Sequence, residues 1–334
     1  MIVTVTLNPA LDLTYPITHL VPHRTHRVSA VSERAGGKGL NVARVLHALG
    51  EPVLATGLLG GPTGAFVARL LDAEGVPSSF VPVAGETRRT VAVVDAADAT
   101  GFWEPGPVVT TAEWSRFVDH FGRLIRGAPV VALCGSLPRG VPIDGYAHLT
   151  HLAAEAGVPV LLDTSGPALA HGLTAGPTVT KPNAAELADL LSAVAGAAPA
   201  DPPSGVPHAE PADPSTGTTS AAEPSVPRSG LTSAAVRGLT SGAVVVTDGV
   251  AGLRAITPDA EFHCVPPRPV TGNPTGAGDA CAAALARGMR DGTAWPALLA
   301  DAVALGAAAV ASPVAGAFDH TVYQDFRELG GIPC

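Results

Sequence analysis

The chain alternates between short apolar runs and stretches in which Ala and Leu recur at helical spacing. The apolar runs predict buried strands at Ile2–Leu7, Val53–Leu59, Val130–Leu133, Val158–Asp163, Thr178–Lys181 and Ala243–Asp248. The intervening stretches predict helices at Leu40–Leu49, Ala65–Glu74, Tyr146–Ala156 and Ala184–Ala195. Strands that alternate with helices in this way are typical of an α/β fold with a mainly parallel central sheet flanked by helices.

Two segments depart from this alternation. Residues 13–34 and 80–104 are richer in Thr, Val and polar side chains, with strand character and no helix between the strands. We expect them to form antiparallel excursions outside the central sheet. In an α/β enzyme such a small β-strand lid commonly closes over a site.

A third segment, residues 196–230, has eight prolines and many Ala, Ser and Thr, but no leucine and no aromatic residue. It cannot bury enough apolar surface to offset the entropy lost on ordering. We therefore expect a disordered, low-complexity surface insertion.

Composition narrows the classes of function. Of 334 residues, 46% are hydrophobic and 15% charged, which indicates a packed chain. The 20 basic and 29 acidic residues give a net charge of −9, so bulk charge disfavours binding to nucleic acid or to an anionic membrane. The longest apolar stretch, Ala297–Ala311, contains Asp301 and is shorter than the roughly 18 residues of a membrane span, which favours a buried helix.

The amino terminus lacks the basic region of a signal peptide, and the four cysteines lie far apart without a CxxC pair. Zinc ribbons and disulfide scaffolds are disfavoured, and a reducing cytoplasm is the expected compartment.

The most informative string, TGNPTGAGD, ends at Asp279 and precedes a predicted helix at Ala280–Met289. Such a glycine-rich turn lets Gly276, Ala277 and Gly278 direct successive backbone N–H groups at an anion, and the helix dipole adds partial positive charge. A carboxylate beside this anion hole can take a proton from an attacking hydroxyl. These are the groups that phosphoryl transfer requires, although Asp279 alone is equally well explained as a helix cap.

A second glycine-rich string, AGGKGLN, opens another predicted helix and carries Lys38. The glycines allow close approach of the backbone to a ligand, and the lysine supplies a mobile charge for phosphate. Because Lys38 is followed by Gly39, the string is not a Walker A loop. The chain also lacks a GxGxxG fingerprint after a strand, which disfavours a dinucleotide oxidoreductase.

A third string, KPNAAE, follows a predicted strand directly. Asn183 and Glu186 are three residues apart at a helix start, so their oxygens can face one spot and organise Mg²⁺ through water. The same spacing is that of an N-cap with a capping-box glutamate, and the residues alone leave both interpretations open.

Together, NPTGAGDA, RAGGKGLNVARVLHALG and KPNAAEL resemble, in order and separation, the signature motifs of the PfkB (ribokinase-like) family of carbohydrate kinases, over nearly the whole chain. TVTLNPALD, GGKGLN, Thr87-Arg88, CGSLPRGVP and LLDTSGPAL are similar to the branch of phosphosugar kinases. The resemblance implies one ribokinase-like domain over residues 1–334. It also implies Mg²⁺ and ATP as cofactor and co-substrate, and a homodimer formed through the lids.

The resemblance implies these roles on the acceptor side of the site. Asp12, at the end of the first strand, binds sugar hydroxyls with Gly37 and Asn41. The substrate phosphate is held by Lys38, Arg88 and Ser136, and Arg27 reaches the site of a partner subunit.

On the donor side, the resemblance implies that Gly276, Ala277 and Gly278 form the anion hole and that Asp279 is the base. It assigns the ATP phosphates and Mg²⁺, the latter through water, to Lys181, Asn183 and Glu186, and the nucleotide pocket to Thr247, Asp248 and Gly249.

One motif departs from the branch. The branch has TRxN at the lid, whereas this chain has Thr90 in place of the asparagine, and Arg89 adds a cation beside it. A shorter hydroxyl in place of an amide leaves the identity of the sugar open.

The resemblance therefore implies ATP-dependent phosphorylation of a ketohexose phosphate, first of all fructose 1-phosphate to fructose 1,6-bisphosphate. 6-Phosphofructokinase and tagatose-6-phosphate kinase are the alternatives. A non-catalytic sugar-phosphate sensor is disfavoured by the intact Asp279, and a nucleoside kinase by Lys38 together with Arg88.

Overall fold

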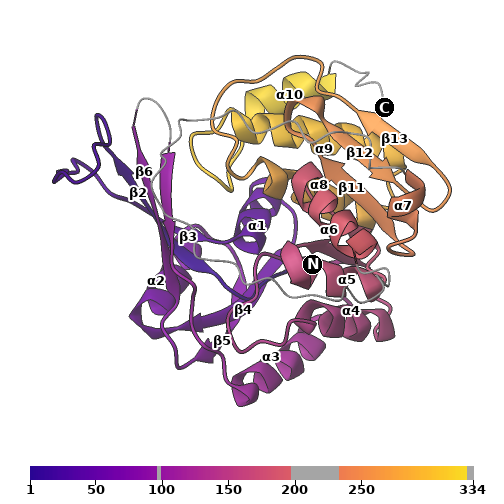
Figure 1. The fold of residues 1–334 in the computed structure, drawn as a ribbon, viewed down its shortest axis with the longest axis horizontal. Helices are drawn as coiled ribbons and strands as arrows, with labels where there is room; N and C mark the ends of the chain where they lie inside the picture. The colour runs from indigo at the N-terminus through magenta and orange to yellow at the C-terminus, as the bar shows by residue number, and fades with distance from the viewer. Residues whose placement is uncertain (96–98, 197–232, 329–334) are drawn as a thin grey trace, which may run out of the picture.

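A computed structural model describes residues 1–95, 99–196 and 233–328, and its central element is a nine-stranded sheet (Figure 1). The strand order is β13-β12-β11-β10-β9-β8-β1-β4-β5, parallel from β11 to β5 and antiparallel in β12 and β13. The strands are β1 (Ile2–Thr6), β4 (Val53–Gly60), β5 (Ser78–Val83), β8 (Val131–Cys134), β9 (Val160–Asp163), β10 (Val179–Thr180), β11 (Ala243–Thr247), β12 (Leu253–Ile256) and β13 (Glu261–Cys264). The predicted α/β fold with a mainly parallel sheet is confirmed.

Helices cover both faces of this sheet because successive strand residues point to opposite sides. In β1, Ile2 packs into the cluster on one face and Val3 into the cluster on the other. The first face carries α1 (Lys38–Ala48), α2 (Gly61–Ala73), α8 (Ala277–Asp291), α9 (Trp295–Val310) and α10 (His320–Glu328). The second carries α3 (Thr111–Leu124), α4 (Gly145–Glu155), α5 (Gly166–Thr174), α6 (Ala184–Gly196) and α7 (Ser233–Arg237).

A separate four-stranded sheet forms the lid and projects from the body of the molecule (Figure 1). Its order is β3-β2-β6-β7, with β2 (Ala10–Pro16), β3 (Ser32–Gly36), β6 (Arg88–Val94) and β7 (Ala99–Trp103). The lid expected from the sequence is present. The expectation of purely antiparallel pairing is wrong, because β2 and β6 run parallel.

Two boundaries also differ from the sequence-based expectation. β1 ends at Thr6, and Pro9, which has no N–H group to donate, separates it from β2, so Asp12 lies within a lid strand and not at the end of the first strand. Residues 80–83 belong to β5, which pairs with β4 in the central sheet.

The parallel topology places the carboxyl ends of β1, β8, β9, β10 and β11 at one edge of the sheet, the usual position of ligand sites in α/β folds. The lid strand β2 continues the chain after β1, and α1 follows β3 directly. Residues from all three predicted motifs therefore meet at this edge.

Of the cysteines, Cys134 and Cys281 are free and buried. Cys264 is disulfide-bonded. Within the described ranges, no helix combines the length and the apolar character needed to cross a membrane. The expected insertion at 196–230 lies, except for Gly196, outside the described residues.

Candidate active site

Asp279 lies in the first turn of α8, where the polypeptide makes a tight turn into the helix. Gly276 is the N-cap and has φ 87°, a left-handed conformation that favours glycine. A Cβ on this glycine would also lie 3.0 Å from the backbone of Ala315. Gly278 is next to a cation, since a Cβ on it would lie 3.4 Å from Nζ of Lys181. The predicted anion hole thus combines a helix N-terminus with a lysine.

The carboxylate of Asp279 is only 7% exposed and accepts a hydrogen bond of 2.8 Å from Nδ2 of Asn41. Burial raises the pKa of Asp279 to about 6, and the nearby carboxylate of Asp163 adds to the increase. The Asn41 hydrogen bond and the ammonium groups of Lys38 and Lys181 oppose it. A carboxylate with a pKa near 6 is suited to accept a proton at neutral pH.

Asp163 is a site residue that the sequence reasoning missed. It ends β9, is fully buried, and pairs with Nζ of Lys38 at 2.9 Å and Nζ of Lys181 at 3.1 Å. Burial alone would raise its pKa, but the two ammonium groups hold the pKa of Asp163 below its usual value. Its carboxylate likewise raises the pKa of Lys38. The signal for this residue was an aspartate at the carboxyl end of a buried strand, in LLDTSG.

The predicted acceptor residues come together around Asn8, which was also missed. Nε of Arg88 donates to the backbone carbonyl of Asn8 at 3.1 Å, and Nδ2 of Asn8 donates to Oγ of Ser136 at 3.2 Å. A Cβ on Gly135, the residue before Ser136, would lie 3.9 Å from Cβ of Lys38. One side of the site therefore carries Arg88 from β6, Ser136 from the segment after β8 and Lys38 from α1.

Asp12 faces the same side from lid strand β2. Its carboxylate accepts a hydrogen bond from the hydroxyl of Thr90 on β6, and it fills the space where Gly36 lacks a side chain. Burial raises the pKa of Asp12, while Thr90 and the nearby arginines oppose the increase. Arg89, in contrast, is exposed and paired with Glu104.

Gly37 has φ 119°, and a Cβ on it would lie 2.8 Å from Cγ2 of Thr6, so the turn into α1 requires glycine there. Arg27 lies on the exposed segment between β2 and β3, and within the described part of this single chain it joins none of the contacts above.

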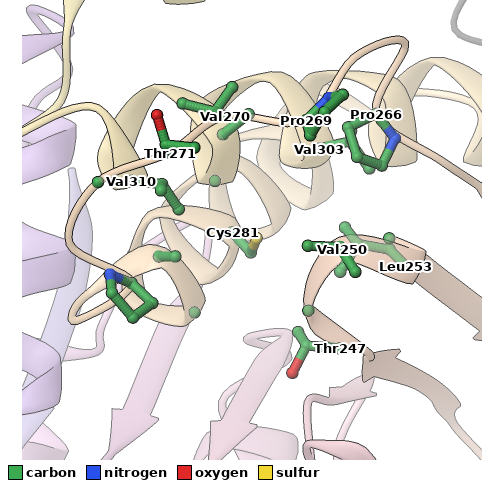
Figure 2. A pocket seen from close by; sticks show the side chains of 18 of the residues that line it. Thr247, Val250, Leu253, Pro266, Pro269, Val270, Thr271, Cys281, Val303 and Val310 are labelled. Carbon is green, nitrogen blue, oxygen red and sulfur yellow. The ribbon is translucent and has the colours of Figure 1, made fainter.

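On the side of Asp279 where the sequence predicts the nucleotide, α8, α9 and the β11–β12 connection line a cavity of about 730 Å³ (Figure 2). Of the three residues predicted to bind the nucleotide, Thr247 and Gly249 line this cavity, whereas Asp248 lines a separate cavity of about 270 Å³. The other walls are mostly apolar and were missed by the motif search; they include Val250, Leu253, Val270, Cys281, Val303 and Val310. Apolar walls of this kind suit the flat ring system of a nucleotide base.

Asn183 and Glu186 form a reciprocal capping box at the start of α6. Oδ1 of Asn183 accepts from the Glu186 N–H at 2.8 Å, and Oε2 of Glu186 accepts from the Asn183 N–H at 2.8 Å. The helix-cap interpretation is therefore realised. The capping box leaves Oε1 of Glu186 for another ligand. The charge of Glu186 raises the pKa of Lys38, so this carboxylate lies near the site. Among the described residues, no three His, Cys, Asp or Glu side chains converge as a direct metal cluster.

Comparison with known proteins identifies related sequences and structures. The sequence profile of the pfkB family carbohydrate kinases matches residues 5–202 and 228–321. Phosphofructokinase-2 from Escherichia coli in complex with fructose-6-phosphate is 26% identical, with a TM-score of 0.79 over 98% of this chain and 99% of that one.

Two further structures share the fold. A protein described as a possible 1-phosphofructokinase from Thermotoga maritima is 23% identical, with a TM-score of 0.76 over 98% of this chain and 97% of that one. Ribokinase from Arabidopsis thaliana, complexed with ribose and ATP, is 20% identical, with a TM-score of 0.70 over 97% of each chain.

Proposed function

The chain belongs to the pfkB family of carbohydrate kinases. We propose that it phosphorylates a ketohexose phosphate and that fructose 1-phosphate is the favoured substrate. The observation that carries this proposal is the group of Lys38, Arg88 and Ser136 on the acceptor side of Asp279. A sugar without phosphate would not need two cations there, whereas a phosphate is bound well by charge-assisted hydrogen bonds.

The acceptor is held by its phosphate at one end and by its hydroxyls at the other. Lys38 and Arg88 neutralise the substrate phosphate, and Ser136 donates to it. Asp12 and Asn41 bind sugar hydroxyls. This arrangement leaves the hydroxyl farthest from the phosphate directed towards Asp279 at the start of α8.

The donor occupies the cavity between α8 and β11. Its base contacts the apolar walls beside Thr247 and Gly249, and Lys181 and Asn183 contact its phosphates. Kinases of this family use ATP with a divalent metal, which neutralises phosphate charge when bound. Glu186 fits that ion with its remaining oxygen, through water, because it provides one free carboxylate oxygen at this edge.

Transfer proceeds in line. Asp279 accepts the proton of the attacking hydroxyl, a new O–P bond forms at the γ-phosphate, and the bond to the β-phosphate oxygen breaks to release ADP. The backbone N–H groups of Gly276, Ala277 and Gly278 and the ammonium of Lys181 stabilise the charge on the transferred group.

The proposal includes a homodimer through the lids. Phe102 and Trp103 of β7 are 60% and 75% exposed, and apolar side chains of this size on a projecting sheet are typical of an interface. Arg27, on the lid segment between β2 and β3, then reaches the partner's site.

The test is ADP release with MgATP and fructose 1-phosphate, fructose 6-phosphate, tagatose 6-phosphate, fructose or ribose. We expect preference for one phosphosugar. We also expect kcat to fall as the pH drops through about 6, because protonated Asp279 cannot accept a proton. Asp279→Asn should lower kcat by about 10²–10⁴-fold with KM little changed. Asp291→Asn, the same change at the exposed end of α8, is the control and should leave kcat near wild type.

Three results would revise the proposal. Turnover of fructose or ribose alone would remove the phosphate role of Lys38 and Arg88. Near-normal turnover by Asp279→Asn would contradict the assignment of Asp279 as the base. Saturable phosphosugar binding without ADP release would identify a sensor.

A further inference from the structure

We propose that Arg44, a buried residue outside the substrate contacts, positions the Asn41 amide so that its N–H group faces the base, Asp279. The inference rests on the proposed function in one respect, since it takes Asp279 as the proton acceptor. Arg44 itself is 5% exposed and lies one helical turn after Asn41 on α1, so it acts through Asn41 as a positioning residue.

All three arms of the Arg44 guanidinium are engaged by different elements. Nε donates to the carboxylate of Glu74 at the end of α2, and Nη2 donates to the backbone carbonyl of Ala35 in β3. Nη1 donates to Oδ1 of Asn41 at 3.2 Å. A planar group fixed at three points cannot rotate away from Asn41 without losing buried hydrogen bonds.

This contact determines which end of the Asn41 amide faces which neighbour. A guanidinium only donates, so the Asn41 atom that faces Arg44 must be the oxygen. The amide nitrogen is then directed at Oδ2 of Asp279, 2.8 Å away. The packing on the other side is tight, because a Cβ on Gly316 would lie 2.8 Å from Oδ1 of Asn41. Asn41 is therefore held in one orientation, 8% exposed, with one amide N–H directed at Asp279 and its oxygen at Arg44.

The orientation matters for the protonation of the base. A donor at Asp279 stabilises the carboxylate, and the Asn41 hydrogen bond accordingly lowers the pKa of Asp279. Without Arg44 the amide can turn over and offer its oxygen instead, which stabilises the protonated, inactive acid. The charged groups that face Asp279 from the surrounding elements are Asp163 on β9, Lys38 on α1 and Lys181 after β10, and the substitution of Arg44 leaves all three in place.

The experiment compares the acidic limb of the kcat–pH profile in Arg44→Met, Asn41→Ala and the double variant. We expect each single change to move the midpoint of the limb upward by roughly one pH unit, the scale of one hydrogen bond to a charged group. If Arg44 acts through Asn41, the double variant shows the shift of Asn41→Ala alone. Additive shifts, or an unshifted limb in folded Arg44→Met, would overturn the inference.

Two further variants separate positioning from loss of stability. Arg44→Lys keeps a group that only donates, so its limb should stay near wild type even where its Tm falls. Arg287→Met removes another paired arginine, partly buried, on α8 itself, where it contacts Asp301 and Tyr323. Its Tm should fall without a shift of the limb. If the midpoint of the limb shifted as much in Arg287→Met as in Arg44→Met, the shift would reflect general destabilisation, and the positioning role would be overturned.

A second measurement makes failure of the inference distinguishable from failure of the proposed function. If the wild-type chain shows no turnover of any phosphosugar, the function fails, and the side-chain amide resonance of Asn41 still reports the contact. That resonance should titrate with Asp279 in wild type, and its titration should be weakened or lost in Arg44→Met. An unchanged titration in folded Arg44→Met would overturn the positioning role independently of activity.

Discussion

The proposed acceptor and donor sides of the site differ in how they are built. The proposed acceptor side consists of charged and polar groups on lid strands and at a glycine-rich helix start, including Asp12 on β2, Arg88 on β6 and Lys38 on α1. The donor side is a cavity of about 730 Å³ with mostly apolar walls. One side binds through a few directional contacts and the other through shape and burial. We therefore expect single substitutions on the two sides to separate the kinetics of the two substrates.

One residue belongs to both sides. Asp163 pairs with Lys38, on the proposed acceptor side, and with Lys181, which lies beside Gly278 in the predicted anion hole. A fully buried carboxylate between two ammonium groups links the two sides through one charge, so its substitution should affect both substrates together.

The largest effect is expected from Asp163→Asn. Removing one partner of a buried ion pair leaves uncompensated charge and costs about 3–5 kcal/mol of unfolding free energy. Both KM values should rise together, with kcat/KM lower by roughly 10²-fold or more. Because the pKa of Asp163 is lowered in the folded state, its stabilisation is present above the unfolded pKa and is lost as the pH falls. The Tm difference from wild type should therefore be large at pH 7 and shrink below about pH 4.

Asp301→Asn is the matched control, because Asp301 pairs with Arg287 away from the site. It should lower Tm with both KM values unchanged. An effect of Asp163→Asn on only one substrate would show that the two sides are not linked through this carboxylate.

Arg88→Ala should separate the two sides next most strongly. Loss of a charge-assisted phosphate contact should raise the KM for the phosphosugar by about 10–100-fold and leave the KM for ATP within a few-fold. Arg89→Ala is the control, since the neighbouring arginine is exposed and paired with Glu104. An equal rise in the KM for ATP would contradict the assignment of Arg88 to the acceptor side.

The same difference explains what the sequence could predict. The strand and helix order follows from apolar periodicity, and Asp279, Lys38 and Asn183 stand in glycine-rich turns or helix starts that a linear motif records. The apolar cavity walls come from β12, the β11–β12 connection, the segment before α8, α8 and α9, and most of them are ordinary Val, Leu, Ala or Pro residues in their own segment. Only the tertiary packing of these elements brings them together, so no local pattern marks them.

Boundaries and pairings at the lid were less predictable for a related reason. The parallel pairing of β2 with β6 joins residues 78 positions apart, as Asp12 with Thr90. The hydrogen bond between these two side chains depends on that register. The sequence shows Thr90 as a departure from the branch, but only the pairing of β2 with β6 shows that its partner is Asp12.

On the donor side, Ala307→Leu should reverse the pattern of Arg88→Ala. Ala307 lines the cavity from α9, and a larger side chain there occupies volume that a nucleotide base would need. We expect the KM for ATP to rise several-fold with the KM for the phosphosugar unchanged. Ala297→Leu, an exposed position on the same helix, controls for helix propensity and should change neither. A rise in both KM values would argue that the cavity is not the nucleotide pocket.

The smallest effect is expected at Thr90, where a substitution tests a single contact on the proposed acceptor side. Its hydroxyl donates to Asp12 and opposes the increase that burial causes in the pKa of that carboxyl. Thr90→Val keeps the shape and removes the donor, so the pKa of Asp12 rises further and the carboxylate is protonated earlier as the pH falls. The KM for the phosphosugar should increase about two- to five-fold at pH 8, because Asp12 stays ionised there and loses one hydrogen bond, and by more at acidic pH. Thr90→Ser retains the hydroxyl and should follow wild type. A KM penalty in Thr90→Val that is independent of pH would show that Thr90 contacts the sugar itself and does not act through Asp12.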